Sequence, residues 1–204
     1  VEALRQHILP YKDKNNILVY CGATKVYTDY FNDESDIDEE RQIETVTKVL
    51  GNELKMRVSM FTSKEKTDER ERLLRSFEEG NLQALIAIKC LDEGVNVPGI
   101  RTAFILASST NPKEYIQRRG RVLRKAIDKP FAEIFDFVVM PHDIYSRPDG
   151  ISNKNAELSL INRELERVNY FMELCENPSA SFAVIDRINE FYKLNYIGGE
   201  DYGI

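Results

Sequence analysis

The stretch Tyr115-Ile116-Gln117-Arg118-Arg119-Gly120-Arg121-Val122-Leu123-Arg124 is the most informative part of the chain. If a helix runs through it, Gln117, Arg121 and Arg124 stand at positions i, i+4 and i+7 and share one face. Several guanidinium groups on one side need anions to meet them, and the planar fork of arginine suits phosphate oxygens. Taken alone, the stretch is explained equally well by a solvated basic face.

A second polar cluster lies upstream, beyond the apolar run 84–88. It reads Leu91-Asp92-Glu93-Gly94-Val95-Asn96-Val97-Pro98. A glycine beside polar side chains permits a ligand to approach the backbone closely at the end of a strand. The alternative is an ordinary exit from a strand into a loop.

Apolar runs and helical patterns alternate through the first two thirds of the chain. The expected strands are 17–21, 56–61, 84–88, 102–107 and 131–139. The expected helices are 38–50, closed by Gly51, then 68–80, with Asp68 and Glu71 as a capping box, and a third that opens at Asn111-Pro112. This order predicts an α/β fold with three layers, in which helices cover both faces of a mainly parallel sheet. Functional residues are then expected at the carboxyl ends of the strands.

The pattern changes between Pro141 and Asn155, which read as a connector. Two amphipathic helices are expected beyond it, because apolar residues recur every three or four positions: Leu158, Ile161, Leu165, Val168, Met172 and Cys175, then Phe182, Ile185, Ile188 and Tyr192. We expect residues 1–145 to form one domain and residues 146–204 to form a connector and a helical hairpin docked on it. A stripe that awaits a partner helix is the alternative.

Composition restricts the partners and the compartment. The net charge of −6 is unlike that of a dedicated duplex-DNA binder, so any nucleic-acid contact must use the local basic cluster from Lys113 to Lys129. The three cysteines are scattered and form no Cys-x-x-Cys pair, which favours a reducing compartment and predicts no metal site. No apolar run approaches the ~20 residues of a membrane helix, and no signal peptide pattern opens the chain. We therefore expect an intracellular protein, cytoplasmic or nucleoid-associated, with no membrane partner.

In their order along the chain, these elements resemble the C-terminal, second RecA-like domain of superfamily-two DNA helicases and translocases. Glu93 to Pro98 looks like motif V, Gln117 to Arg124 looks like motif VI, and Ile17 to Thr24 looks like motif IV. The segment Arg70 to Gly80 also matches the family pattern of arginine, phenylalanine and glycine. The resemblance covers residues 10–140. It is nearer to restriction-enzyme motor subunits and XPB-like repair helicases than to DEAD-box RNA helicases, because Gln opens motif VI.

The resemblance implies a role for each motif residue. In that family two RecA-like lobes hold ATP between them, and the second lobe supplies arginine fingers. Arg121 and Arg124 would be these catalytic fingers, and the residues near the nucleotide would be Gln117, Glu93, Gly94 and Asn96. Contacts to strand phosphates, with little base specificity, would come from Gly22, Ala23, Thr24, Thr62 and Ser63.

Two residues depart from the family pattern. Asn96 stands where the family usually has Asp, so its contact to the ribose loses the charge of a carboxylate. Ile88 stands where many members have Thr or Ser as a phosphate contact. Lys89, the next residue, is a candidate substitute as a point charge on the nucleic-acid strand.

Other motifs of the family do not occur in the sequence. It contains no Gly-x-x-x-x-Gly-Lys-Ser/Thr loop and no acidic Asp-Glu motif for a metal, and it does not begin with Met. We expect a piece of a longer protein whose missing N-terminal RecA-like lobe holds ATP and Mg²⁺, so that this chain alone is inactive. The expected partner is nucleic acid, with DNA favoured over RNA. The alternative is a non-catalytic nucleic-acid-binding or protein-interaction module on a degenerate lobe, against which the intact Arg121 and Arg124 count.

Overall fold

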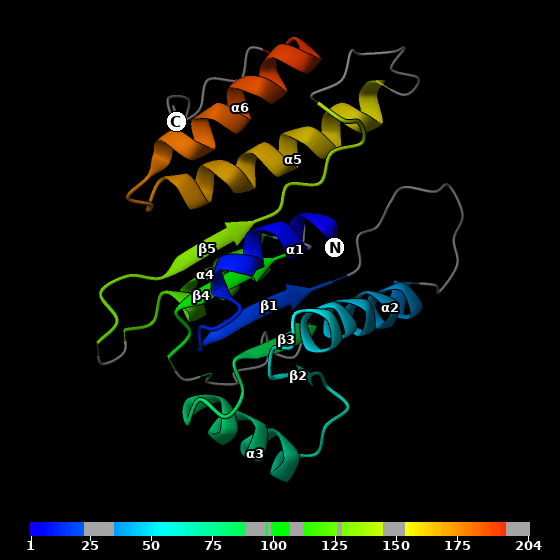
Figure 1. Ribbon diagram of the computed structural model, residues 1–204. Coiled ribbons are helices and arrows are strands. Elements are labelled where there is room, and N and C mark those ends of the chain that lie inside the picture. The colour runs from blue at the N-terminus through cyan, green and yellow to red at the C-terminus, as the bar shows by residue number, and fades with distance from the viewer. Residues whose placement is uncertain are drawn as a thin grey trace. The chain divides into compact units, whose positions relative to one another are not determined.

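The computed structural model describes residues 1–22, 35–88, 97, 99–106, 112–125, 128–144 and 154–194. These residues belong to two compact units, Val1–Phe137 and Val138–Ile204. The first unit contains α1 (Glu2–Ile8), a 3₁₀ turn η1 (Leu9–Tyr11), β1 (Ile17–Cys21), α2 (Ser35–Lys48), a π-helical turn η2 (Val49–Glu53), β2 (Val58–Phe61), α3 (Thr67–Glu78), β3 (Ala84–Ile88), β4 (Thr102–Ile105), α4 (Pro112–Val122) and β5 (Glu133–Asp136) (Figure 1). The second contains α5 (Lys154–Met172) and α6 (Pro178–Tyr192).

The five strands form one sheet in the order β2-β3-β1-β4-β5, and every pairing is parallel. Ile17 stands opposite Ala84 on one side and Thr102 on the other, which makes β1 the central strand. All five residues of β1 are buried, so both faces of the sheet are covered. Continuous apolar strands are typical of such a sheet, and the predicted α/β class is confirmed.

Helices α1 and α2 pack on one face of the sheet. Leu4 and Ile8 of α1 and Val46 of α2 belong to the same buried cluster as Ile17 and Val19 of β1. The predicted apolar face of α2 is therefore confirmed. The alternate residues of β1 point to the opposite face and are equally buried.

Two predicted helix ends are wrong. Gly51 does not close α2, because the chain continues as a π-helical turn to Glu53. The capping box of Asp68 and Glu71 does not form, since α3 begins at Thr67 with no side-chain hydrogen bond at its cap. Asp68 instead lies in the first turn, where a carboxylate interacts favourably with the helix dipole.

The second unit has a core of its own. Ile161, Leu165 and Val168 of α5 pack with Ile185 and Ile188 of α6, so the predicted helical hairpin is confirmed. Its docking on the sheet stays a prediction. Within the described ranges, no helix is both long and apolar enough to cross a membrane.

A buried ion pair organises one side of α5. Glu164 and Arg167 are 3% and 2% exposed, and their oxygens and nitrogens lie 2.6 and 2.8 Å apart in a two-pronged contact. Glu164 also accepts the backbone N–H of Val139 at 3.0 Å. The carboxylate is thus fully partnered, as burial of a charge requires.

Candidate nucleotide and nucleic-acid site

Helix α4 contains the first part of the basic stretch and ends within it. It ends at Val122, and the chain leaves it through a turn in which the N–H of Arg124 lies 3.4 Å from the carbonyl oxygen of Arg121. Arg124 therefore lies beyond the helix, and the predicted single helical face for Gln117, Arg121 and Arg124 is wrong. Lys129, seven residues after Val122, donates hydrogen bonds to the carbonyl oxygens of Val122 and Arg124 and so caps this helix end.

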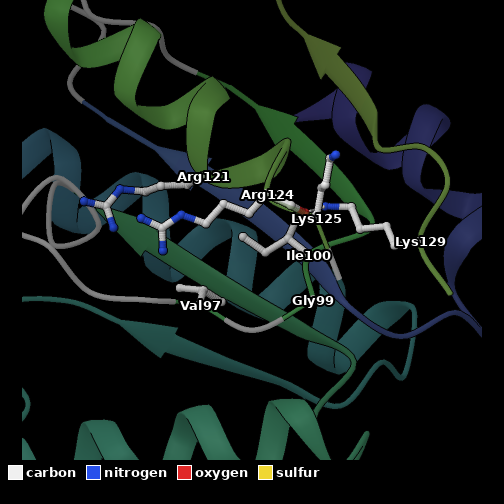
Figure 2. Close-up of a pocket in the computed structure, with 7 residues that line it drawn as sticks. All are labelled: Val97, Gly99, Ile100, Arg121, Arg124, Lys125 and Lys129. Atoms are coloured by element: carbon white, nitrogen blue, oxygen red, sulfur yellow. Dashed lines mark hydrogen bonds between the residues drawn. The ribbon is translucent and has the colours of Figure 1, made fainter. Parts of the chain in front are cut away.

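The two arginines nevertheless reach one cavity. This cavity of about 380 Å³ is lined by Val97, Gly99, Ile100, Arg121, Arg124, Lys125 and Lys129. Figure 2 shows the guanidinium groups of Arg121 and Arg124 extending in the same direction, away from the side chain of Lys129. Four of the seven lining residues are cationic and none is acidic, so the cavity suits a polyanion. Such a set of donors fits the phosphates of a nucleotide.

Burial and the positive charge near the cavity both lower the pKa of Lys129. Burial lowers the pKa of its ammonium group, and the positive charge of Arg101 lowers that pKa further. Arg101 itself donates a hydrogen bond to the backbone carbonyl of Asp128 at 2.8 Å. The nearby positive charge of Arg101 thus disfavours the protonated form of Lys129, as a like charge does.

The backbone of the cavity lies at an unexpected edge of the sheet. Ile100 precedes β4, which starts at Thr102, and Lys129 precedes β5, which starts at Glu133. The cavity is therefore built beside the amino ends of β4 and β5, whereas the predicted phosphate contacts follow the carboxyl ends of strands. The physical reason is that α4 follows β4 and runs back along the sheet, so its last turn returns to the amino side.

The predicted phosphate contacts at the carboxyl ends of β1 and β2 are engaged by side chains. The N–H of Gly22 donates to the side-chain oxygen of Gln42 at 3.0 Å. The N–H of Thr62 donates to Glu65 at 2.6 Å, and the Thr62 hydroxyl donates to the same carboxylate at 3.0 Å. Ser63 is exposed. A phosphate at either strand end has to displace these acceptors.

Several predicted site residues lie outside the described part of the chain: Ala23, Thr24, Lys89, Glu93, Gly94 and Asn96. Gln117 is described and exposed, but it is not among the residues that line the cavity. Sequence reasoning recognised Lys125 and Lys129 only as part of a basic cluster, and it gave no role to Gly99 or Ile100. No sequence pattern predicts the turn that brings these residues close to Arg121 and Arg124. In the described ranges, no group of three or more His, Cys, Asp or Glu side chains is arranged to hold a metal ion.

Comparison with known proteins decides the family. Residues 1–126 match the helicase conserved C-terminal domain. The chain belongs to this family. The expected resemblance to superfamily-two helicases is thereby confirmed.

Two curated relatives match over shorter stretches. The chain is 35% identical over 68 residues to the DNA 3'-5' translocase XPB2 of Sulfurisphaera tokodaii, a match that covers 33% of the chain and 16% of the relative. It is 33% identical over 84 residues to putative helicase 22 of the Sulfolobus islandicus filamentous virus, covering 41% of the chain and 15% of that protein. The matched part is thus a small fraction of the length of either relative.

Solved structures show the same fold at low identity. The yeast DEAD-box splicing factor Prp28 aligns with a TM-score of 0.62 and 17% identity, covering 99% of this chain and 37% of that one. The C-terminal part of the Fun30 ATPase domain aligns with a TM-score of 0.51 and 13% identity, covering 81% and 52%. Both comparisons support the RecA-like fold and say nothing further about substrates.

Proposed function

We propose that this chain is the second lobe of an ATP-dependent DNA helicase or translocase, in which Arg121 and Arg124 act as arginine fingers. The observation that carries the proposal is the cavity of about 380 Å³, whose described lining residues include Arg121, Arg124 and two lysines and no acidic side chain. Membership in the helicase family says why phosphate is the expected anion. The alternative is a solvated basic face that binds no nucleotide.

The chain would contribute to catalysis by electrostatic stabilisation of negative charge. ATP, when bound, supplies the phosphoanhydride bond whose cleavage drives movement. Arg121 and Arg124 would donate charge-assisted hydrogen bonds to phosphate oxygens and stabilise the negative charge that grows on them. The family assigns the phosphate loop and Mg²⁺ to a first lobe, and neither motif occurs in this sequence. The chain alone should therefore show no ATPase activity above background.

DNA is the proposed nucleic-acid substrate because the relative from Sulfurisphaera tokodaii is named a DNA translocase. The backbone groups of Gly22 and Thr62 would bind strand phosphates after release from Gln42 and Glu65. Contacts of this kind carry little sequence information, so weak binding that falls steeply with salt is expected. RNA binding of equal strength would remove the preference for DNA.

The test measures DNA-stimulated ATP turnover by the full-length protein. Arg121→Ala and Arg124→Ala should each lower kcat by roughly 10³-fold or more, the scale of an arginine finger. Arg124→Lys should rescue little, since an ammonium group cannot reproduce the fork. Arg75→Ala, which removes an exposed arginine from α3, is the matched control and should turn over like wild type. Near-normal turnover in both finger variants would overturn the proposal and favour a non-catalytic module.

A further inference from the structure

The turn between α4 and β5 contains a lysine whose ammonium group is bonded to the backbone. Lys129 lines the cavity, yet its Nζ donates to the carbonyl oxygens of Val122 and Arg124, the latter at 2.9 Å. Val122 is the last residue of α4, where carbonyl groups lack partners within the helix and the helix dipole is negative. Lys129 therefore caps α4 and binds the backbone of Arg124 directly.

The residue before Lys129 is anchored to the sheet. Arg101 donates from Nη1 to the carbonyl oxygen of Asp128 at 2.8 Å, and Asp128 has the left-handed φ of 57°. The backbone N–H of Arg101 bonds to Asn16 at 2.8 Å, and its carbonyl oxygen accepts from Glu133 at 2.9 Å. The backbone directly before Lys129 is thus bonded to Arg101, which precedes β4.

We propose that Lys129 is a positioning residue, which fixes the backbone at Arg124 so that its guanidinium group meets the nucleotide. This inference rests on the proposed function of Arg124. An arginine finger stabilises charge that develops in the transition state, so a displaced finger lowers kcat more than it raises KM. A displacement of about 1 Å can cost roughly 10²-fold in rate.

A double-mutant cycle on the full-length protein tests this role. Lys129→Met, which keeps the apolar stem and removes the donors, should lower the kcat of ATP hydrolysis by roughly 10- to 100-fold with little change in the KM for ATP. Lys129→Met combined with Arg124→Ala should turn over no more slowly than Arg124→Ala alone, because Lys129 acts through Arg124. Lys14→Met removes an exposed lysine before β1 and controls for the loss of one charge.

A conservative variant separates positioning from general stability. Lys129→Arg keeps donors for both carbonyl oxygens and should restore most of the lost kcat. Because burial and Arg101 lower the pKa of Lys129, the wild-type kcat should fall on the alkaline side as the cap loses its charge. Lys129→Arg should lack that alkaline limb, since a guanidinium group stays protonated.

The outcomes distinguish this inference from the proposed function. Near-normal turnover of Arg124→Ala would overturn both. A collapse of Arg124→Ala beside wild-type turnover of Lys129→Met would overturn the positioning role alone. Losses that multiply in the double variant would also overturn the positioning role. So would a Lys129→Arg variant that melts like wild type but does not recover the kcat.

Discussion

Glu65 accepts both polar hydrogens of Thr62, with its Oε2 atom 2.6 Å from the backbone nitrogen and its Oε1 atom 3.0 Å from the hydroxyl oxygen. Arg70 adds a hydrogen bond from Nη2 to the carbonyl oxygen of Thr62 at 2.9 Å. The strand end that the sequence offered to a phosphate therefore already holds an anion, supplied by the chain itself. The carboxylate of Glu65 therefore competes with a nucleic-acid phosphate for the donors of Thr62.

Replacement of Glu65 by alanine should strengthen binding to single-stranded DNA. It frees the N–H and hydroxyl of Thr62, and a gain of about fivefold corresponds to the ~1 kcal/mol net worth of one hydrogen bond. Fluorescence anisotropy with a labelled oligonucleotide at low salt measures the change. Glu69→Ala removes an exposed carboxylate from the first turn of α3 and is the control for charge. Equal gains in both variants would contradict a specific role for Glu65.

Arg119 and Arg124 should differ in what they contribute to stability. Arg119 is 9% exposed, whereas Arg124 is exposed. Arg119→Ala should lower the free energy of unfolding by about 1–3 kcal/mol, because it removes a buried polar side chain that has interaction partners. Arg124→Ala should stay within about 0.5 kcal/mol of wild type, as is usual at surface sites. Urea denaturation of the isolated chain compares them, and equal losses would mean that Arg124 is structural.

Leu165 should be essential to the second unit. Its side chain is 0% exposed among Ile161, Ile185 and Ile188, so Leu165→Ala leaves a cavity and should cost about 2–5 kcal/mol. The same substitution at Leu174, which is 65% exposed, should change stability by less than about 0.5 kcal/mol. Amide hydrogen exchange in α6 reports on this unit specifically. Unchanged protection in Leu165→Ala would show that the stripe is not packed as described.

Cys21 should make the first unit sensitive to alkali. Burial raises the pKa of its thiol to about 12, whereas an unfolded cysteine titrates near about 8.5. The folded state keeps the proton while the unfolded state ionises, so this stabilisation is complete below the unfolded pKa and is lost as the pH rises toward the folded pKa. The free energy of unfolding should fall by at most about 1.4 kcal/mol per pH unit from this group.

The Cys21→Val variant isolates that contribution, because valine is of similar size and does not titrate. Burial also raises the pKa of Tyr11 and Tyr192, but both tyrosines are present in wild type and variant. Urea midpoints measured between neutral and alkaline pH should therefore decline more gently in Cys21→Val. Parallel declines in the two proteins would show that the thiol ionises without unfolding.

Most of the architecture could be predicted from local patterns. The apolar runs at 17–21 and 84–88 became β1 and β3 with the predicted bounds, and the three-four spacing after residue 154 became two helices. The errors lie at helix ends. Gly51 failed to stop the helix because the chain continues there as a π-helical turn. Helix α4 stopped before Arg124, and Lys129 caps its end. A cap of this kind comes from a side chain in the following turn, whose conformation apolar periodicity does not predict.

The sequence by itself determined the family, the parallel α/β class and the identity of Arg121 and Arg124 as candidate fingers. These follow from residue types at short spacings, which govern helix faces, strand burial and the matching of guanidinium groups to phosphate. Only the tertiary structure decided that the two arginines share a cavity with Ile100 and Lys129. The hydrogen bond from Thr62 to Glu65, three residues along the chain, is local, but no pattern in the sequence predicts it. Those relationships depend on how the chain crosses from one strand to the next, and on side-chain hydrogen bonds that local periodicity does not encode.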